Sequence, residues 1–219
     1  DDNDGRIRLD IRNLTRTVHA GSKAKTLLDN VNLTIEPQEF VAILGGSGAG
    51  KSTLLGALTG MAPATAGSVL INGLDMYGEY AMIRSIIGYV PQDDIIHMDL
   101  SVEEVLSYAA RLRMPEDTDD SQIASHIDSV LADLELTRHR QTLVRELSGG
   151  QRKRVSIGVE LLTRPSLFFL DEPTSGLDPG LERVMMELLR KLANQGRTVV
   201  LVTHATVNIH LCDKVVFLA

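Results

Sequence analysis

The segment FVAILGGSGAGKST, residues 40–53, constrains the fold of this 219-residue chain more strongly than any other part of the sequence. An apolar run over residues 40–44 leads into a glycine-rich loop, and a helix-compatible segment over residues 51–59 follows. The loop matches the pattern G-x-x-x-x-G-K-[ST] of a phosphate-binding P-loop, which requires this succession of strand, loop and helix. The segment therefore predicts an α/β P-loop NTPase core; a glycine-rich turn that happens to precede a helix is the alternative.

The residue types in this loop suit a nucleotide phosphate. Small residues let consecutive backbone N–H groups surround phosphate oxygens, and the helix N-terminus that follows favours anions. We expect Lys51 to reach the β- and γ-phosphates of ATP, Ser52 to ligate Mg²⁺ and Thr53 to contact the α-phosphate. The loop residues expected to hold the nucleotide are Gly45, Gly46, Ser47, Gly48, Ala49, Gly50, Lys51, Ser52 and Thr53.

The composition limits the classes of protein and partner. With 43% hydrophobic and 23% charged residues, the chain can bury one sizeable core. Its formal net charge of −7 is unsuited to coating nucleic acid, and we expect no nucleic-acid partner. The single cysteine, Cys212, excludes an internal disulfide, fits a reducing compartment and lies in an apolar stretch typical of a buried structural thiol.

The two ends of the sequence give a further expectation. No apolar run approaches the length of a bilayer span and no signal peptide opens the chain, so we expect a soluble unit. The chain starts with Asp1 rather than Met and stops directly after a strand-like segment, residues 215–218. We therefore expect a domain excised from a longer protein.

Apolar patterns predict the order of strands and helices. Polar and apolar residues alternate over residues 6–12 and 31–35, which indicates half-buried antiparallel strands, with a polar turn over residues 20–25 between them. Residues 40–44 are apolar throughout, as in a central strand covered on both faces. Further strands are expected at residues 67–71, 86–90, 167–170, 198–202 and 214–218, and a helix at residues 179–194 that Asp178 caps.

A helical insert is expected after Gln92. Ser101 and Glu104 form a capping box before a helix that reaches about Arg113. A stripe with helical spacing follows, formed by Ile123, Ile127, Val130, Leu131 and Leu134. We therefore predict one domain over residues 1–219, in which residues 1–92 and 148–219 form the core and residues 93–147 form a helical subdomain.

Two carboxylates end the apolar strand LFFLDE, residues 167–172. Beside a P-loop, Asp171 would hold Mg²⁺, usually through water, and Glu172 would polarise the water that attacks the γ-phosphate. An ordinary acidic turn after a strand is the alternative, which the P-loop disfavours.

A second phosphate-binding surface is expected at LSGGQ, residues 147–151. Ser148 offers a hydroxyl, while Gly149 and Gly150 leave backbone N–H groups uncovered at a helix N-terminus. A simple capped helix start is the alternative. A chain with one P-loop has no internal use for a second phosphate-binding surface.

The order of these motifs resembles the nucleotide-binding domain of ABC ATPases, over nearly the whole chain. The order is the P-loop, Gln92, LSGGQ, LFFLDE, residues 175–178 (SGLD) and His204. The resemblance implies a P-loop core with a mixed, mainly parallel sheet, an N-terminal antiparallel β subdomain and an inserted α-helical subdomain. It also implies a head-to-tail dimer, in which Ser148, Gly149, Gly150 and Gln151 of one subunit cover ATP on the other subunit's P-loop.

The resemblance assigns roles to further residues. Gln92 is the Q-loop residue that senses Mg²⁺ and the attacking water, Asp178 belongs to the D-loop at the dimer interface, and His204 is the switch histidine that contacts the γ-phosphate. We expect catalysis to rest on Glu172, His204, Gln92 and Lys51, with Ser52, Gln92 and Asp171 at the metal.

Residues 149–178 resemble the white or eye-pigment (G-type) half-transporters more closely. Ala205 and Thr206 depart from the Gln-Pro that often follows the histidine in that subfamily. The aromatic residue that stacks on adenine in many ABC domains would fall near Val18, but no aromatic residue precedes Phe40. Val18 or His19 is then expected to pack on the base.

Some charged residues have ordinary explanations. Arg152, Lys153 and Arg154 are expected to form a solvated helix face; a helper role toward the partner's phosphates is the less favoured alternative. His97, His126 and His139 have no metal-ligand spacing and are expected at the surface.

The sequence therefore predicts an ATP- and Mg²⁺-dependent ATPase domain of an ABC transporter, at the cytoplasmic face of a membrane. Expected partners are a second copy and a transmembrane domain, which is expected on the same polypeptide. The alternative is a soluble ABC-type ATPase that acts as a mechanical factor. A nucleotide-binding module without hydrolysis is disfavoured because Glu172 and His204 are both present.

Overall fold

The computed structural model describes residues 6–20 and 23–219. Residues 21–22 of the expected hairpin turn and the first five residues lie outside the described residues. Within the described part, the strands form a five-stranded sheet of order β6-β7-β8-β3-β9 and a four-stranded sheet of order β2-β1-β4-β5. The first sheet is parallel and the second is antiparallel. The fold class expected from the sequence is confirmed.

The strands have the following bounds: β1 (Leu9–Ala20), β2 (Lys23–Ile35), β3 (Phe40–Leu44), β4 (Ala66–Ile71), β5 (Leu74–Asp75), β6 (Ile87–Val90), β7 (Leu167–Asp171), β8 (Thr198–Thr203) and β9 (Lys214–Phe217). The α-helices are α1 (Lys51–Leu58), α2 (Tyr80–Ile83), α3 (Val102–Arg113), α4 (Asp120–Asp133), α5 (Gly149–Leu161) and α6 (Pro179–Asn194).

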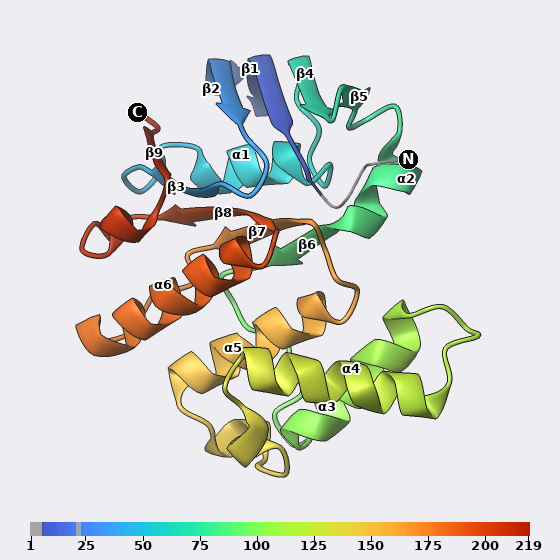
Figure 1. Ribbon diagram of the computed structural model, residues 1–219. Helices are drawn as coiled ribbons and strands as arrows, with labels where there is room; N and C mark the ends of the chain where they lie inside the picture. Colours follow the sequence, from blue (N-terminus) through green and yellow to red (C-terminus); the bar gives the residue numbers. More distant parts are fainter. Residues whose placement is uncertain (1–5, 21–22) are drawn as a thin grey trace.

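The parallel sheet separates two hydrophobic cores. Every residue of β3, β7 and β8 is buried, which agrees with the uniformly apolar pattern of a sheet covered on both faces. Phe40 and Phe168 face the core formed with α3–α6, whereas the next residues in their strands face the core formed with α1 and the antiparallel sheet. Figure 1 shows α1 between the two sheets and the other long helices on the opposite side of the parallel sheet.

The parallel arrangement determines where the site forms. Because β3, β6, β7 and β8 run in the same direction, their carboxyl ends meet at one edge of the sheet. The P-loop follows β3, Gln92 follows β6, Glu172 follows β7 and His204 follows β8. β8 lies between β3 and β7, so the carboxylates and the P-loop come from strands that are not neighbours.

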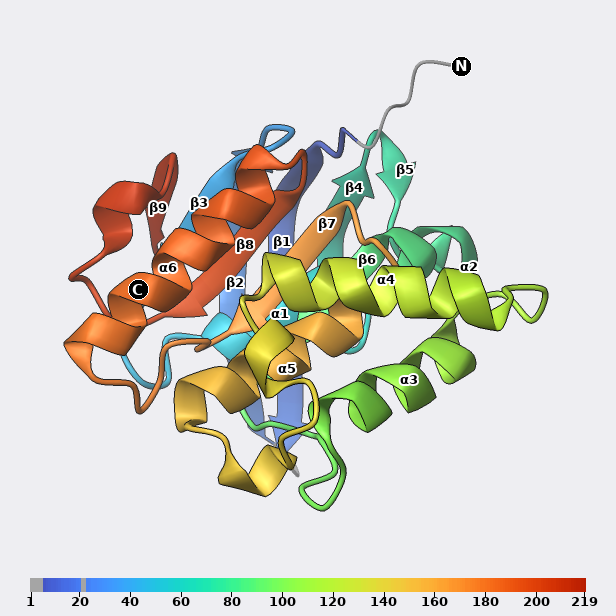
Figure 2. The ribbon, with the colours of Figure 1, turned by 60° about the horizontal axis from the view of Figure 1, so that its bottom comes forward.

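Helices α3, α4 and α5 group beside α6, as Figure 2 shows from the helical side. The expected capping box of Ser101 and Glu104 is present at the start of α3. The expected apolar stripe of α4 is buried, and it joins the same core as α5 and one face of the parallel sheet. Since α5 contacts both parts, the boundary of the helical subdomain at residue 147 stays a prediction.

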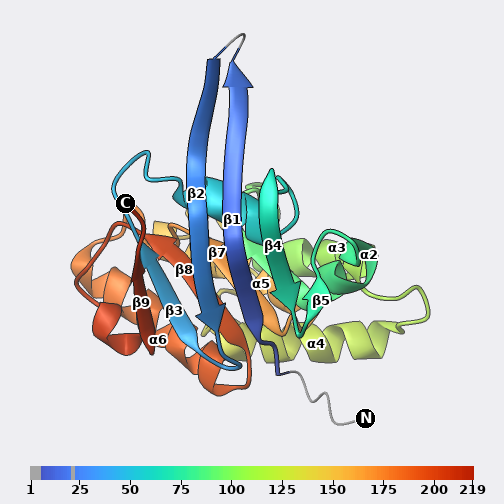
Figure 3. The same cartoon turned by 90° about the horizontal axis from the view of Figure 1, so that it is seen from above.

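The N-terminal hairpin is longer than the alternation of apolar residues indicates. β1 and β2 pair as far as Ala20 and Lys23, and the hairpin projects beyond the rest of the molecule in Figure 3. Residues 23–26 of β2 are exposed, so backbone pairing rather than burial forms this end. The short β5 and α2 also lack a clear apolar period. Among the described residues, no helix combines the length and apolar character needed to cross a membrane.

Candidate nucleotide site

A pocket of about 670 Å³ lies at the carboxyl edge of the parallel sheet. It is lined by Lys25, Leu27, Ser47, Gly48, Gly50, Lys51, Ser52, Thr53, Gln92, Glu172 and His204. The fold thus brings Gln92, Glu172 and His204 to the P-loop, although these residues are far apart in the sequence. This convergence is the geometry of a phosphate-processing site.

The P-loop backbone requires glycine at its tightest approaches. Gly50 has φ of +90°, and a Cβ there would lie 2.7 Å from the Leu27 carbonyl oxygen. A Cβ on Gly45 would lie 2.8 Å from the carbonyl oxygen of Leu218. Lys51 extends along this loop, and its Nζ donates to the carbonyl oxygens of Gly45 at 2.7 Å and Gly46 at 3.0 Å.

Glu172 is held between two basic side chains. Its Oε1 lies 3.6 Å from Lys51 Nζ, and its Oε2 lies 2.9 Å from His204 Nδ1. The Glu172 residue is 7% exposed, whereas the His204 side chain, which also lines the pocket, is 65% exposed. Glu172 also has φ of +47°, a backbone strain of about 1–3 kcal/mol for a residue with a side chain. Such strain is typical of functional positions, and no sequence pattern marks it at Glu172.

Asp171 is buried beneath Ser52, and its environment fits a cation. Burial raises the pKa of Asp171; the Ser52 hydroxyl opposes this increase, and the neighbouring Glu172 carboxylate adds to it. Among the described residues, Asp171 Oδ1 has no hydrogen-bond partner although it is buried. Mg²⁺ suits this donor set because it binds through one or two protein oxygens and completes its shell with phosphate and water.

The signature residues and the D-loop residue lie outside this pocket. Ser148 caps α5 by accepting a hydrogen bond from the Gln151 amide, and Ser148 and Gly149 are exposed while Gly150 is buried. Asp178 is exposed and caps α6 through the amides of Gly180 and Leu181. Within one chain, the structure therefore does not bring residues 148–151 or 178 to the P-loop pocket.

Comparison with known proteins identifies the family. Residues 28–175 match the ABC transporter family, which is more than half of the 219 residues. The chain belongs to the ABC transporter family. It is an ATP-hydrolysing nucleotide-binding domain of this family, as the order of motifs predicted.

Relatives of the G type are among the similar ABC proteins. ABC transporter ATP-binding/permease protein Rv1747 of Mycobacterium tuberculosis is 49% identical over 211 residues, which are 96% of this chain and 24% of that protein. ABC transporter G family member 14 of Arabidopsis thaliana is 42% identical over 206 residues, covering 90% of this chain and 31% of that protein. The chain thus spans about a quarter to a third of the length of these relatives.

Solved ABC cassettes share the fold. The dimeric structure of the bacterial cassette MJ0796 matches with a TM-score of 0.84 and 31% identity, over 96% of this chain and 94% of that chain. The structure of cbiO1 from Clostridium perfringens, part of the ABC transporter complex cbiONQ, matches with a TM-score of 0.86 and 30% identity, over 95% of this chain and 83% of that chain. MJ0796 has also been solved as a dimer in a post-hydrolysis state with ADP and Pi.

Two residues of the hairpin line the pocket. They are Lys25 and Leu27 of β2, whereas Val18 and His19 are not among the lining residues; that Val18 or His19 packs on the base stays a prediction. Val18 pairs with Lys25 across the hairpin. No motif marks Lys25 or Leu27 as pocket residues, and the register of β1 and β2 places them there.

The expectation of a solvated face at residues 152–154 is wrong for Lys153. Lys153 is buried, with its Nζ 2.7 Å from Asp94 Oδ1. Arg152 and Arg154 also bind carbonyl oxygens, of Leu147 and Leu134. Of the three residues only Lys153 is buried, and Arg152 and Arg154 are half-buried.

Two further expectations need adjustment. His139 is half-buried, and its Nε2 lies 3.0 Å from the Gln151 side-chain nitrogen, so it supports the signature turn rather than lying free at the surface. Cys212 is half-buried rather than buried, and desolvation raises its pKa to about 11, which keeps it a thiol.

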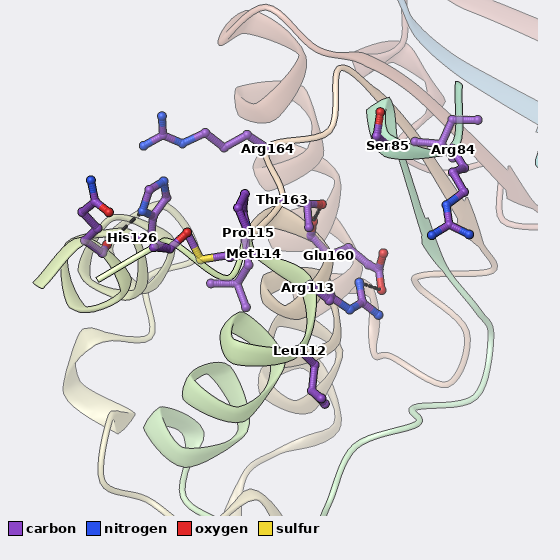
Figure 4. A pocket seen from close by; sticks show the side chains of 14 residues that line it. Arg84, Ser85, Leu112, Arg113, Met114, Pro115, His126, Glu160, Thr163 and Arg164 are labelled. Carbon is purple, nitrogen blue, oxygen red and sulfur yellow. Dashed lines mark hydrogen bonds and ion pairs between the residues drawn. The ribbon is translucent and has the colours of Figure 1, made fainter. Parts of the chain in front are cut away.

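A second, larger cavity of about 750 Å³ lies among the ends of α3, α4 and α5. Figure 4 shows its lining, with the ion pair of Arg113 and Glu160 at 2.7 Å. It contains none of the expected nucleotide-binding residues, so volume alone does not identify the ABC nucleotide site.

Proposed function

We propose that this domain hydrolyses Mg²⁺-ATP at the described pocket and thereby powers transport across a membrane by the longer protein to which it belongs. The convergence of Gln92, Glu172 and His204 on the P-loop carries the assignment of the site. The names of the relatives, which include an ATP-binding/permease protein and G family transporters, support the transport role.

Glu172 is the proposed base toward the attacking water. Its buried carboxylate faces the pocket, and its contact with His204 Nδ1 fixes its orientation. His204 would then be placed to contact the γ-phosphate from the exposed side. Lys51 and the loop amides offset charge on the phosphates, so that catalysis consists of positioning and charge stabilisation with no covalent intermediate.

Ser52, Asp171 and Gln92 are the proposed residues at Mg²⁺. The orphaned buried oxygen of Asp171 beneath Ser52 supports this choice. Bound Mg²⁺ would supply charge neutralisation on the phosphates.

The complete site is proposed to form between two copies of the chain, head to tail. Ser148, Gly149, Gly150 and Gln151 lie outside the pocket of their own chain, and the exposed Ser148 and Gly149 are free to cover a partner's nucleotide. Asp178 would lie at the same interface. The dimeric MJ0796 structures support this arrangement.

Exposed apolar side chains support a transmembrane partner. Ile95 follows the Q-loop and is 84% exposed, and Leu112 at the end of α3 is 86% exposed. Met61, Met98 and Tyr108 are further exposed apolar residues. We propose that a transmembrane domain, on the same polypeptide, covers some of these side chains at the cytoplasmic face of the membrane.

The decisive experiment uses the Glu172→Gln variant. It is expected to bind ATP, to lose turnover and to accumulate as an ATP-dependent dimer in size-exclusion chromatography. Wild-type ATPase rate per subunit is expected to rise with protein concentration, because two chains complete each site. Unchanged hydrolysis in the variant would exclude Glu172 as the base, and a constant rate in a verified monomer would exclude the composite site.

A further inference from the structure

Lys153 is a buried cation in α5, the helix that the signature serine Ser148 caps. Only 9% of its side chain is exposed. Lysine is seldom buried in folded proteins unless its charge is paired and its hydrogen bonds are made. The groups that pair with Lys153 therefore indicate what it holds in place.

The Lys153 ammonium finds all its acceptors in one short segment, residues 91–94. Its Nζ lies 2.7 Å from Asp94 Oδ1 and donates to the carbonyl oxygens of Gln92 at 2.7 Å and Pro91 at 3.2 Å. An ammonium group has three donors and no acceptor, so this segment satisfies it completely. The Ser156 hydroxyl, also on α5, donates to the same Asp94 oxygen at 2.9 Å.

The same segment carries a nucleotide-site side chain. Gln92 lines the P-loop pocket, while its own carbonyl oxygen accepts from Lys153. Fixing the main chain at residues 91–94 therefore limits where the Gln92 amide can reach. Displacement of a catalytic group by about 1 Å can lower a rate on the order of 100-fold.

We propose that Lys153 is a positioning residue for ATP hydrolysis, which fixes the main chain at Gln92 to the helix that begins at Ser148. The inference rests on the proposed function, since it assigns to Lys153 a role in the regulation of the proposed ATPase site. Gln92 serves the nucleotide of its own chain and Ser148 that of the partner, so Lys153 makes these two contacts move together.

A purely structural lysine would give a different pattern of effects. If Lys153 acts through Gln92, its removal matters only while the Gln92 amide is present. The effects of Lys153→Met and Gln92→Ala on kcat are then non-additive. If Lys153 only stabilises the fold, the two effects add.

The test measures kcat, KM and nucleotide affinity for Lys153→Met, Gln92→Ala and the double variant, with a fluorescent ATP analogue as the binding probe. Lys153→Met is expected to lower kcat about 10- to 100-fold. Affinity is expected to stay within about twofold, because the P-loop contacts are unchanged. The double variant is expected to match Gln92→Ala alone. Amide hydrogen exchange over residues 91–96 is expected to accelerate in Lys153→Met.

Arg154→Met is the matched control, since Arg154 lies on the same helix but binds Leu134 and Glu135 instead of the Q-loop. It is expected to leave kcat and exchange at residues 91–96 unchanged. If Lys153→Met does not fold, Asp94→Asn and Lys153→Arg replace it. Asp94→Asn is then expected to lower kcat and Lys153→Arg to retain most of it.

Additive effects in the double variant, or unchanged kcat in folded Lys153→Met, would overturn the role of Lys153. The failure of the proposed function is separate, because it would appear as absent Mg²⁺-dependent hydrolysis in the wild type. Even then, unchanged exchange at residues 91–96 in Lys153→Met would still refute the positioning, and accelerated exchange there would support it.

Discussion

The Nδ1 atom of His204 lies 2.9 Å from Oε2 of Glu172, at the ends of two neighbouring parallel strands. The His204 backbone amide also donates to the same oxygen at 3.3 Å. This pair fixes the direction of the carboxylate that we propose as the base. The pair also connects the buried Glu172 carboxylate to the exposed His204 ring, which can reach a nucleotide.

The first prediction concerns this pair. His204→Ala removes the ring contact but leaves the backbone contact to Glu172. We expect kcat to fall about 10²- to 10⁴-fold, the range of a general acid–base contribution, with ATP affinity little changed. Steady-state ATPase assays and a nucleotide-binding titration measure the two quantities. His97→Ala is the control, because His97 does not line the nucleotide pocket.

The second prediction separates the two roles of Ser148. Ser148→Ala removes a helix cap, which lowers the free energy of unfolding by about 0.5–2 kcal/mol. It should also lower the ATPase rate about 10- to 100-fold, because a hydrogen bond to a charged group contributes about 1.5–3 kcal/mol. ATPase assays above the dimerisation concentration and urea unfolding measure these effects.

Asp119→Ala is the matched control for Ser148→Ala. Asp119 forms the same kind of capping box at α4, away from the nucleotide pocket. It should lose similar stability and keep the wild-type rate. Equal losses of rate in both variants would mean that Ser148 acts only as a cap.

The third prediction concerns Asp171, whose pKa is raised mainly by burial. When the pKa of a carboxyl group is higher in the folded than in the unfolded state, the group destabilises the folded protein. The free energy of unfolding then falls as the pH rises from the unfolded-state pKa, about 3.9, through the folded-state pKa. Asp171→Asn should therefore stabilise the nucleotide-free protein by about 0.5–2 kcal/mol at neutral pH. The difference should vanish below about pH 4, where the carboxyl is protonated in both states.

Urea unfolding at several pH values without Mg²⁺ measures this difference. With saturating Mg²⁺-ATP the order should reverse, because ligand binding stabilises the folded wild type more than the variant. An Asn variant that is less stable at neutral pH without ligand would show that the Asp171 carboxylate is compensated in the folded protein.

The fourth prediction concerns Cys212, whose pKa burial raises to about 11. At neutral pH its thiolate fraction is about 10²- to 10³-fold lower than that of a free cysteine with pKa about 8.5. Alkylation by iodoacetamide should be slower by at least that factor, and denaturation should restore the ordinary rate. Rapid labelling of the folded protein would contradict the half-buried placement.

Sequence reasoning found the elements whose signals are local. The P-loop helix, the cap residues Ser101 and Asp178, and helix α6 depend on neighbouring residues, and all appear at their expected places. The apolar runs of β3 and β7 also sufficed, because burial on both faces demands them. The exposed end of the β1–β2 hairpin has no such apolar pattern, so the sequence predicts a shorter hairpin than the structure contains.

Lys153 and Lys25 show what local signals miss. A run of three basic residues looks the same in sequence whether it lies at the surface or bonds to acceptors within the protein. Only the packing of α5 against residues 91–94 distinguishes the two cases. Lys25 reaches the nucleotide pocket through strand register. Both depend on contacts between segments that are distant in the chain.

The sequence by itself determined the motifs of the site, since phosphate binding restricts residue types over short spans of backbone. From those motifs it determined the family and the P-loop fold. Only the tertiary structure decided that Glu172 lies between Lys51 and His204, and that Asp171 keeps a buried oxygen without a hydrogen-bond partner among the described residues. These relationships depend on strand order and helix packing, which no single stretch of sequence encodes.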